Sequence, residues 1–430
     1  LEIDAHKENE IIEAVESAKG VTNKPTLIIS KSTIGKYAPN KENTSGVHGS
    51  PLGENEFELF LENIGFSGDP FTHDSEIYSY FDEKRAEDNS KYDEWKANLE
   101  SKLQSDKNFR QLWNQFNNLE IQEVELELSS DEASRVVGGK ILREYGLSNK
   151  FIIGGSADLA ASTKQIISDN TFGSNNYEGN SIEFGIREHA MGGIVNGLAL
   201  HSKLIPYGST FLVFSDYMRP SMRLASLMKV NSLFIFTHDS IYLGEDGPTH
   251  QPVEHLMSLR LIPNLDVIRP SNSKELIHSY RYALEKRDNP IAIILSRQNM
   301  KFFDQDLSYK DFQTGAYEFR QGTDITLVAT GSEVELALEI STKLSDFSVQ
   351  IISAPILNRL SEERLKSLGL SQNIFTIELG RTIGWDTYIK NIKKSFSIDS
   401  FGESAPIDQL AEKFNFSAEL ISNEIRSLLN

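Results

Sequence analysis

The feature that most constrains the fold is a repeated alternation of β-branched apolar runs with helical stretches. Three such runs, 150–155, 231–239 and 289–297, are separated by longer segments of helical periodicity. Continuous apolar runs are typical of strands buried on both faces, and crossover helices make neighbouring strands parallel. This part of the chain is predicted to be an α/β fold with a mainly parallel sheet.

The same alternation extends toward both ends of the chain. From residue 318 the segments DITLVATGSEVELALEISTKL, SVQIISAP and NIFTIEL predict a further α/β unit. Near the other end, apolar spacing predicts a helix over 8–19, stopped by Gly20, that feeds a buried strand within 25–35. The charged segment 66–120 carries Tyr and Trp at loosely helical intervals and is predicted to be a helical linker.

Charge and cysteine content exclude several classes of function. The net charge is −19, from 43 basic and 62 acidic residues, which disfavours nucleic acid and anionic membranes as partners. The absence of Cys excludes disulfides, thiolate catalysis and Cys-bound metal, and it fits a cytoplasmic location. No apolar run is long enough to span a bilayer.

Polar segments follow the predicted strands: GSADLAAS, HDSIYLGEDGPTH and RQN. Ligands of parallel sheets bind beyond the carboxyl ends of the strands, so these segments are expected to form one site. Taken singly, Glu188 is more often structural, an aromatic such as Phe211 is more often core, and Arg135 is more often a solvated charge. Taken together, a carboxyl beside an aromatic box suits a flat ring that contains nitrogen.

Longer strings carry a family resemblance. GGSADLAAS, FGIREHAMG, STFLVFSDYMRPSMRLA, THDSIYLGEDGPTHQPVEHL, LSRQN and GESAP resemble the transketolases, which depend on thiamine diphosphate. The opening, KPTLIISKSTIGKYAPNK followed by VHGSPLG, is similar to the later part of that family's diphosphate-binding domain. The resemblance covers essentially the whole chain in co-linear order.

The resemblance implies an α/β, three-domain transketolase-like architecture with mainly parallel sheets and an incomplete first domain. The expected parts are the end of the diphosphate-binding domain (1–65), a helical linker (66–125), a pyrimidine-binding domain (126–302), a linker (303–317) and a C-terminal domain (318–430). No GDG segment followed by Asn occurs, so the magnesium or calcium ligands are expected in a missing N-terminal segment, and no metal ligand is assigned here.

The implied reaction belongs to the pentose phosphate pathway. A two-carbon ketol unit is transferred reversibly from a ketose phosphate, such as xylulose 5-phosphate, to an aldose phosphate, such as ribose 5-phosphate. This chain by itself is expected to be inactive, yet to form a homodimer whose active sites lie at the subunit interface.

The resemblance also assigns roles to residues. Glu188 would hydrogen-bond the pyrimidine ring of the cofactor, and His48 and His250 would donate to oxygens where charge develops. Other cofactor contacts are expected from Asp158, Leu159, Phe211, Phe214 and Tyr217. On the substrate side, Asp246 would read a sugar hydroxyl. The sugar phosphate would be held by Arg135, Ser162, His238 and Arg297.

Three alternatives remain open. Dihydroxyacetone synthase uses an unphosphorylated acceptor, and deoxyxylulose-phosphate synthase has a different domain placement. A non-catalytic dimerisation partner that lends its pyrimidine pocket to another subunit is the third. Comparing ribose phosphate with formaldehyde as the acceptor separates the first from transketolase, and restoration of cofactor binding by an N-terminal fragment would identify the third.

Overall fold

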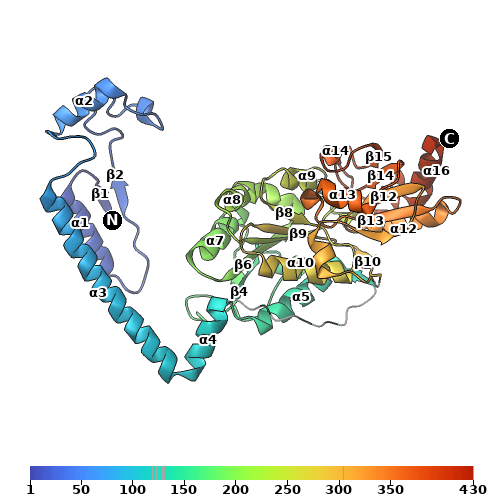
Figure 1. The fold of residues 1–430 in the computed structure, drawn as a ribbon, viewed down its shortest axis with the longest axis horizontal. Coiled ribbons are helices and arrows are strands. Elements are labelled where there is room, and N and C mark those ends of the chain that lie inside the picture. The colour runs from blue at the N-terminus through green and yellow to red at the C-terminus, as the bar shows by residue number, and fades with distance from the viewer. Residues whose placement is uncertain (119–120, 122–123, 125, 127–130, 304, 430) are drawn as a thin grey trace. The chain divides into compact units, whose positions relative to one another are not determined.

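The computed structural model describes residues 1–118, 121, 124, 126, 131–303 and 305–429. It divides into two compact units, Leu1–Asp106 and Lys107–Asn430. Figure 1 draws the ribbon of both, coloured from blue at the N-terminus to red at the C-terminus.

The first unit pairs two short parallel strands and adds helices to them. Its elements are β1 (Glu2–Asp4), α1 (Glu8–Lys19), β2 (Ile29–Lys31), η1 (Ser45–Val47), α2 (Glu54–Asn63) and α3 (Ser75–Ser105). The helix predicted over 8–19 is confirmed by α1. A strand within 25–35 is present as β2. The prediction that this strand is buried is wrong, because all three of its residues are exposed. The reason is that β2 pairs with β1 alone, so no wider sheet encloses it.

The long helix α3 has no buried residue, and its aromatic side chains Tyr78, Tyr80 and Phe81 are exposed in the structure. The next helix, α4 (Lys107–Asn118), opens the second unit.

A six-stranded sheet organises residues 131–301, here called the six-stranded region. Its strand order is β5-β4-β6-β7-β9-β8, and every neighbouring pair is parallel, which confirms the predicted fold class. The elements are β3 (Asp131–Ala133), α5 (Ser134–Ser148), β4 (Ile152–Ser156), α6 (Ala160–Thr163), β5 (Ser181–Glu183), α7 (Glu188–His201), β6 (Ile205–Phe211), η2 (Leu212–Phe214), α8 (Ser215–Met228), β7 (Leu233–Thr237), η3 (Ile241–Leu243), α9 (His255–Arg260), β8 (Asp266–Ile268), α10 (Ser273–Glu285), β9 (Ile291–Leu295) and β10 (Asn299–Lys301). β3 and β10 form a separate antiparallel pair.

The strand β7 explains why the run 231–239 is apolar throughout. Leu233 and Ile235 pack into the core that contains α5 and α10. Phe234 and Phe236 pack into a second core that contains α7 and α8. Successive side chains of a strand point to opposite faces, so this sheet has a buried layer on each side.

A five-stranded sheet organises residues 317–429, here called the five-stranded region. Its order is β11-β13-β12-β14-β15, in which only the β11–β13 pair is antiparallel. The elements after β10 are α11 (Tyr309–Gln313), β11 (Tyr317–Arg320), β12 (Ile325–Ala329), α12 (Glu333–Lys343), β13 (Val349–Ser353), η4 (Leu357–Arg359), α13 (Glu362–Leu368), β14 (Ile374–Ile377), α14 (Trp385–Tyr388), β15 (Ile392–Phe396), α15 (Ile407–Lys413) and α16 (Ala418–Leu429).

The two sheet regions share one continuous core. The cluster that contains Val137 of α5 and Ile235 of β7 also contains Leu327 of β12 and Ile351 of β13. The five-stranded region is therefore packed directly against the six-stranded region. Within the described part of the chain, no helix combines the length and the apolar character that crossing a membrane requires.

Candidate active site

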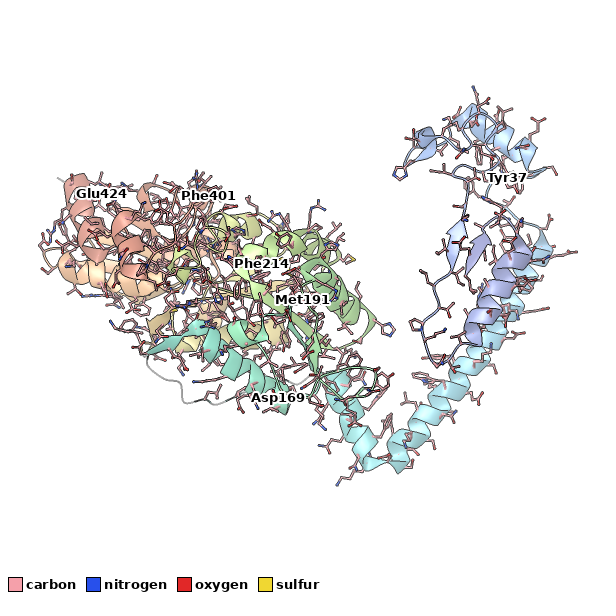
Figure 2. The ribbon with its side chains drawn as sticks, turned by 180° about the vertical axis from the view of Figure 1, so that it is seen from behind. Tyr37, Asp169, Met191, Phe214, Phe401 and Glu424 are labelled. Carbon is pink, nitrogen blue, oxygen red and sulfur yellow. The ribbon has the colours of Figure 1, made fainter. Side chains whose placement is uncertain are left out.

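An aromatic wall stands at the carboxyl end of β6. Phe211 closes the strand, Phe214 follows in η2 and Tyr217 lies in the first turn of α8. The rings of Phe211 and Phe214 are stacked, with centroids 5.9 Å apart and planes 8° apart. Tyr217 lies 6.0 Å beyond Phe214 and is 66% exposed, so the wall runs from the core to the surface. Figure 2 labels Phe214 beside Met191 of the neighbouring helix α7.

Glu188 places a carboxyl at the same edge of the sheet. It is the first residue of α7, which connects β5 to β6, and this crossover places the helix start near the carboxyl ends of the strands. The side chain belongs to a residue that is 8% exposed, and no described residue donates a hydrogen bond to it or forms an ion pair with it. The Glu188 oxygens are not among the buried side-chain atoms without a partner, so they remain accessible to a ligand.

Two hydroxyls near the end of β6 also lack partners among the described residues. The side-chain oxygens of Ser209 and Thr210 are buried without a hydrogen bond. Both residues are fully buried, and as neighbours on a strand their side chains point to opposite faces of the sheet, so they do not face one common ligand.

The turn after β4 adds a cavity to this edge. Asp158 has a left-handed φ of 60°, and Leu159 precedes the short helix α6. Asp158, Glu183 and Arg187 line a cavity of about 380 Å³. Arg187 is the residue before Glu188, so this cavity adjoins the start of α7.

A cluster of cationic and imidazole groups forms the other half of the site. Arg135, at the start of α5, donates from Nη1 to the carbonyl of Ser162. Burial lowers the pKa of Arg135, and the charge of Arg297 lowers it further. Burial lowers the pKa of His238 to about 3, with smaller effects in the same direction from Arg135, Arg297 and His250. Because charges act on one another in this way only at short range, the four side chains lie close together.

The described residues provide no carboxylate to pair with Arg135 or Arg297, although the protein carries a net charge of −19. Like charges gathered in a partly buried place repel one another, and a bound anion would relieve that repulsion. The arrangement therefore has the chemistry of an anion site, with two guanidinium groups to form bidentate contacts.

The two histidines join the anion site to the aromatic wall. The His238 ring lies 3.7 Å from the Phe211 ring, and its Nδ1 is 2.7 Å from Thr237 Oγ1. The His250 ring lies 5.6 Å from that of Phe214. The aromatic wall and the basic cluster are thus parts of one continuous site.

The loop 244–251 carries Asp246, four residues before His250. Asp246 is exposed between Gly244 and Gly247, whose φ values of 88° and 76° favour glycine. The side chain of Gln251 fixes the loop by donating to the carbonyls of Ile241, Gly244 and Glu403, at 3.1, 2.9 and 2.9 Å. The Ser404 hydroxyl donates to the carbonyl of Glu245.

His48 lies in the first unit, directly after η1. It is therefore not among the predicted residues that the second unit brings together. Those of the second unit that have a described contact or charge interaction with one another are Arg135, Ser162, Phe211, Phe214, Tyr217, His238, His250 and Arg297.

Reasoning from the sequence missed the polar residues behind the cluster. Asp239, Arg269 and Glu333 are buried, and both carboxylates accept hydrogen bonds from the Arg269 guanidinium. The signal that could have indicated them is a charged residue directly after a buried strand, as Arg269 follows β8.

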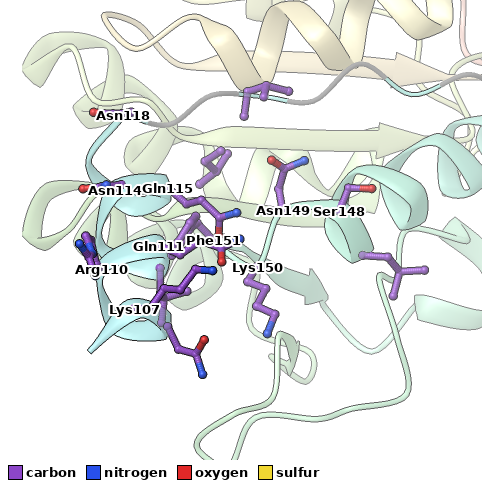
Figure 3. Close-up of a pocket in the computed structure, with 15 residues that line it drawn as sticks. Lys107, Arg110, Gln111, Asn114, Gln115, Asn118, Ser148, Asn149, Lys150 and Phe151 are labelled. Atoms are coloured by element: carbon purple, nitrogen blue, oxygen red, sulfur yellow. The ribbon is translucent and has the colours of Figure 1, made fainter. Parts of the chain in front are cut away.

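Two other features involve none of the predicted residues. A cavity of about 940 Å³ is lined by α4 and by residues 147–151, with Lys107, Arg110 and Lys150 as its cationic groups (Figure 3). Asp216, Glu254 and His255 lie close enough to hold a metal ion. His255 Nε2 already lies 3.2 Å from an Asp216 oxygen, and both carboxylates are more than half exposed, as is common for acidic groups that hold no metal ion.

Three family models match the chain. They describe the thiamine diphosphate binding domain of transketolase at residues 1–119, the pyrimidine binding domain at 133–302 and a transketolase-like C-terminal domain at 315–417.

Similar proteins come from several organisms. A transketolase from Staphylococcus aureus strain MW2 is 38% identical over 451 residues, which cover 99% of this chain and 67% of that protein. The structure of transketolase from Leishmania mexicana superposes with a TM-score of 0.92 at 30% identity, covering 100% of this chain and 66% of that one. A transketolase from Pichia stipitis in complex with sedoheptulose-7-phosphate gives a TM-score of 0.90 at 31% identity, with the same coverage. The chain thus spans about two thirds of the length of these relatives, and it belongs to the transketolase family.

Proposed function

We propose that this chain supplies the pyrimidine-binding and sugar-phosphate-binding parts of a transketolase site. The reaction is the reversible transfer of a two-carbon ketol unit from a ketose phosphate to an aldose phosphate. The observation that carries the proposal is the cluster of Arg135, Arg297, His238 and His250 beside the aromatic wall. Such a cluster favours phosphorylated sugars, and a relative's structure holds sedoheptulose-7-phosphate.

The residues of the aromatic half fit thiamine diphosphate. Phe211, Phe214 and Tyr217 offer stacked faces to a pyrimidine ring, and the unpaired carboxyl of Glu188 can exchange a hydrogen bond with a ring nitrogen. When bound, the cofactor supplies a nucleophilic carbon and an electron sink. Asp158 and Leu159, in the turn after β4, are proposed to hold the cofactor in place. His48, in the first unit, is proposed to donate a hydrogen bond to it.

The residues of the basic half are proposed to orient the sugar. Arg135, Arg297 and His238, with Ser162, hold the phosphate, while Asp246 accepts from a hydroxyl near the reacting carbon. His250 lies between the two halves of the site, since its ring contacts Phe214 and its charge acts on His238. It is proposed to move a proton to or from the reacting oxygen.

Further properties are proposed on the family's pattern. A magnesium or calcium ion is proposed to accompany the cofactor's diphosphate. The absence of Cys and the bacterial relatives support a cytoplasmic location. A homodimer with active sites at its interface is supported by exposed apolar side chains on the packed helices α7 and α8, namely Ile194, Leu200, Leu224, Leu227 and Met228.

The proposal is tested by calorimetric binding of ribose 5-phosphate and ribose to the purified chain. We expect ribose 5-phosphate to bind more tightly by at least about tenfold, because only the phosphate can pair with two guanidinium groups. Arg135→Met and Arg297→Met should each remove most of that difference. Arg426→Met is the control, because Arg426 lies on α16 in the five-stranded region and pairs there with Asp346. Equal affinity for the two sugars would contradict the proposal.

Turnover is the second readout. The chain is incubated with thiamine diphosphate, Mg²⁺, xylulose 5-phosphate and ribose 5-phosphate, and seven-carbon and three-carbon sugar phosphates are followed by mass spectrometry. Binding without products would agree with the expectation that the chain by itself is inactive. Formation of both products would overturn that expectation and support the complete activity.

A further inference from the structure

Behind the basic cluster, Arg269 joins the two sheet regions. Its side chain is fully buried, and its Nε and Nη2 donate to one oxygen of Asp239 at 3.0 and 2.7 Å. Nη2 also donates to Glu333 Oε1 at 3.2 Å, and Nη1 donates to the other oxygen of Glu333. The same Nη1 reaches the carbonyl of Thr330 at 3.0 Å. One guanidinium thus spans the end of β7 and the turn between β12 and α12.

The first end of this network adjoins His238. Asp239 is the next residue, and His238 has a left-handed φ of 62°, which is uncommon for a residue with a bulky side chain. A backbone in that region persists only where its surroundings fix it. The two hydrogen bonds from Arg269 to Asp239 provide such a fixed point one residue from the imidazole.

The second end of the network adjoins Arg297. Gln298 is the next residue, and its Nε2 donates to Ser332 Oγ at 3.2 Å. The Ser332 hydroxyl in turn donates to Glu333 Oε1 at 2.6 Å. The residues that follow His238 and Arg297 are therefore both tied to the short segment Ser332–Glu333 of the five-stranded region.

The turn itself is closely fitted. Gly331 has a φ of 54° and donates its backbone N–H to the carbonyl of Arg269 at 3.0 Å, and a Cβ there would lie 2.8 Å from the Arg269 side chain. The start of α12 is thus filled by protein groups, and its contacts leave little freedom of position.

Other polar contacts join the two sheet regions without approaching the site. The Tyr317 hydroxyl donates to Glu275 at 2.9 Å, and Arg359 contacts Asp266 at 3.1 Å. These contacts already hold the two regions together. The additional contacts of Ser332 and Glu333 differ from them, because they reach the residues next to His238 and Arg297.

We propose that the five-stranded region positions the phosphate-binding side chains His238 and Arg297, with Glu333, Ser332 and Arg269 as positioning residues. The proposal rests on the proposed function, because it takes His238 and Arg297 as phosphate ligands. It gives the five-stranded region a part in substrate affinity, although the predicted site residues all lie outside it.

The test compares Glu333→Gln with Tyr317→Phe, a matched loss of a buried polar contact between the same regions. Inorganic phosphate is titrated into each chain by calorimetry, and the ring resonances of histidine are recorded on ¹⁵N-histidine-labelled protein. We expect Glu333→Gln to weaken phosphate binding by about fivefold or more, the lower end of typical coupling between sites, and to shift the His238 resonance. Tyr317→Phe should change neither. Ser332→Ala, a milder change, should act in the same direction and serves if Glu333→Gln does not fold.

The outcomes separate the two proposals. If the wild-type chain binds phosphate and His238→Asn does not, while Glu333→Gln and Ser332→Ala behave as Tyr317→Phe, the positioning role is wrong and the site stands. If the wild-type chain binds no phosphate, or His238→Asn binds it as tightly, the proposed function fails and the positioning role falls with it. A loss of thermal stability in Glu333→Gln equal to that in Tyr317→Phe, together with weaker phosphate binding, supports the inference.

Discussion

At the scale of single residues, His238 shows how burial sets the chemistry of the site. His238 is 5% exposed. The positive or ionisable groups of Arg135, Arg297 and His250 lie near its ring. Both burial and these charges disfavour imidazolium, so the ring is neutral at physiological pH. Its Nδ1 is next to Thr237 Oγ1, and no described residue bonds Nε2. A neutral ring can therefore use Nε2 toward a ligand.

The lowered pKa of His238 predicts acid sensitivity. The folded-state value is about 3 and the ordinary value is 6.5. Below pH 6.5 His238 binds a proton in the unfolded chain but not in the folded chain. Its contribution therefore makes the free energy of unfolding fall as the pH drops from 6.5 toward 3. The slope contributed by one such group is at most about 1.4 kcal/mol per pH unit. Urea unfolding between pH 4 and 7 should show a shallower dependence in His238→Asn.

The same residue can be observed directly. The ¹⁵N shifts of His238 should remain those of a neutral ring at pH 5, because burial lowers its pKa to about 3. A His238 ring that titrates near 6.5 would contradict the described burial.

Replacing Arg269 is expected to cause a large loss of stability. Arg269→Met leaves Asp239 and Glu333 as buried carboxylates without their counter-charge, a change that costs about 3–5 kcal/mol when one partner of a buried pair is lost. The triple variant Asp239→Asn, Arg269→Met, Glu333→Gln removes the charges together and should recover part of that loss. Chemical denaturation measures both, and equal losses in the single and triple variants would show that charge is not the cause.

At the scale of elements, glycines let α7 lie close to its neighbours. A Cβ on Gly192 would lie 2.7 Å from the Cβ of Ser221 on α8, and one on Gly208 of β6 would lie 2.9 Å from the Met191 side chain. The start of α7 carries Glu188, so the close packing of this helix against α8 and β6 also fixes the backbone position of that residue.

Adjacent glycines on α7 provide a matched pair of variants. Gly192→Ala should destabilise the chain by about 1–2 kcal/mol, because the added methyl group overpacks the contact with α8. Gly193→Ala meets nothing within 4 Å and should stabilise the helix by about 0.5–1 kcal/mol. Thermal unfolding of the two variants gives the comparison, and a change of the same sign in both would contradict the packing described.

The sequence allowed the elements to be predicted better than their connections. The apolar runs 231–239 and 289–297 became β7 and β9, because strands buried on both faces leave an unmistakable pattern. The burial predicted for the strand within 25–35 failed because one chain segment cannot reveal whether other strands cover it. Arg269 and Glu333 escaped notice because their contact joins positions 64 residues apart, and no local pattern marks it.

At the scale of the whole molecule, the exposed apolar side chains on α7 and α8 form a surface that a second protein subunit could cover. Leu227 is 68% exposed and Leu200 is 59% exposed, on helices that pack against each other. A surface of this kind is typical of an interface between subunits.

The proposed homodimer gives a prediction at this scale. Leu227→Lys should shift the mass measured by light scattering toward that of the monomer, because a charge at the centre of an apolar contact would have to be desolvated. Leu428→Lys, on α16, is the control, since Leu428 is 45% exposed but lies in the five-stranded region. A wild-type chain that is monomeric at micromolar concentration would contradict the proposal.

The central claim is that the basic cluster holds the phosphate of a sugar. A crystal structure of the chain with ribose 5-phosphate tests it most directly. We predict the phosphate between Arg135, Arg297 and His238, with the sugar directed toward His250 and the aromatic wall. Phosphate bound instead among Lys107, Arg110 and Lys150 in the cavity of Figure 3, with the basic cluster left without it, would contradict the account.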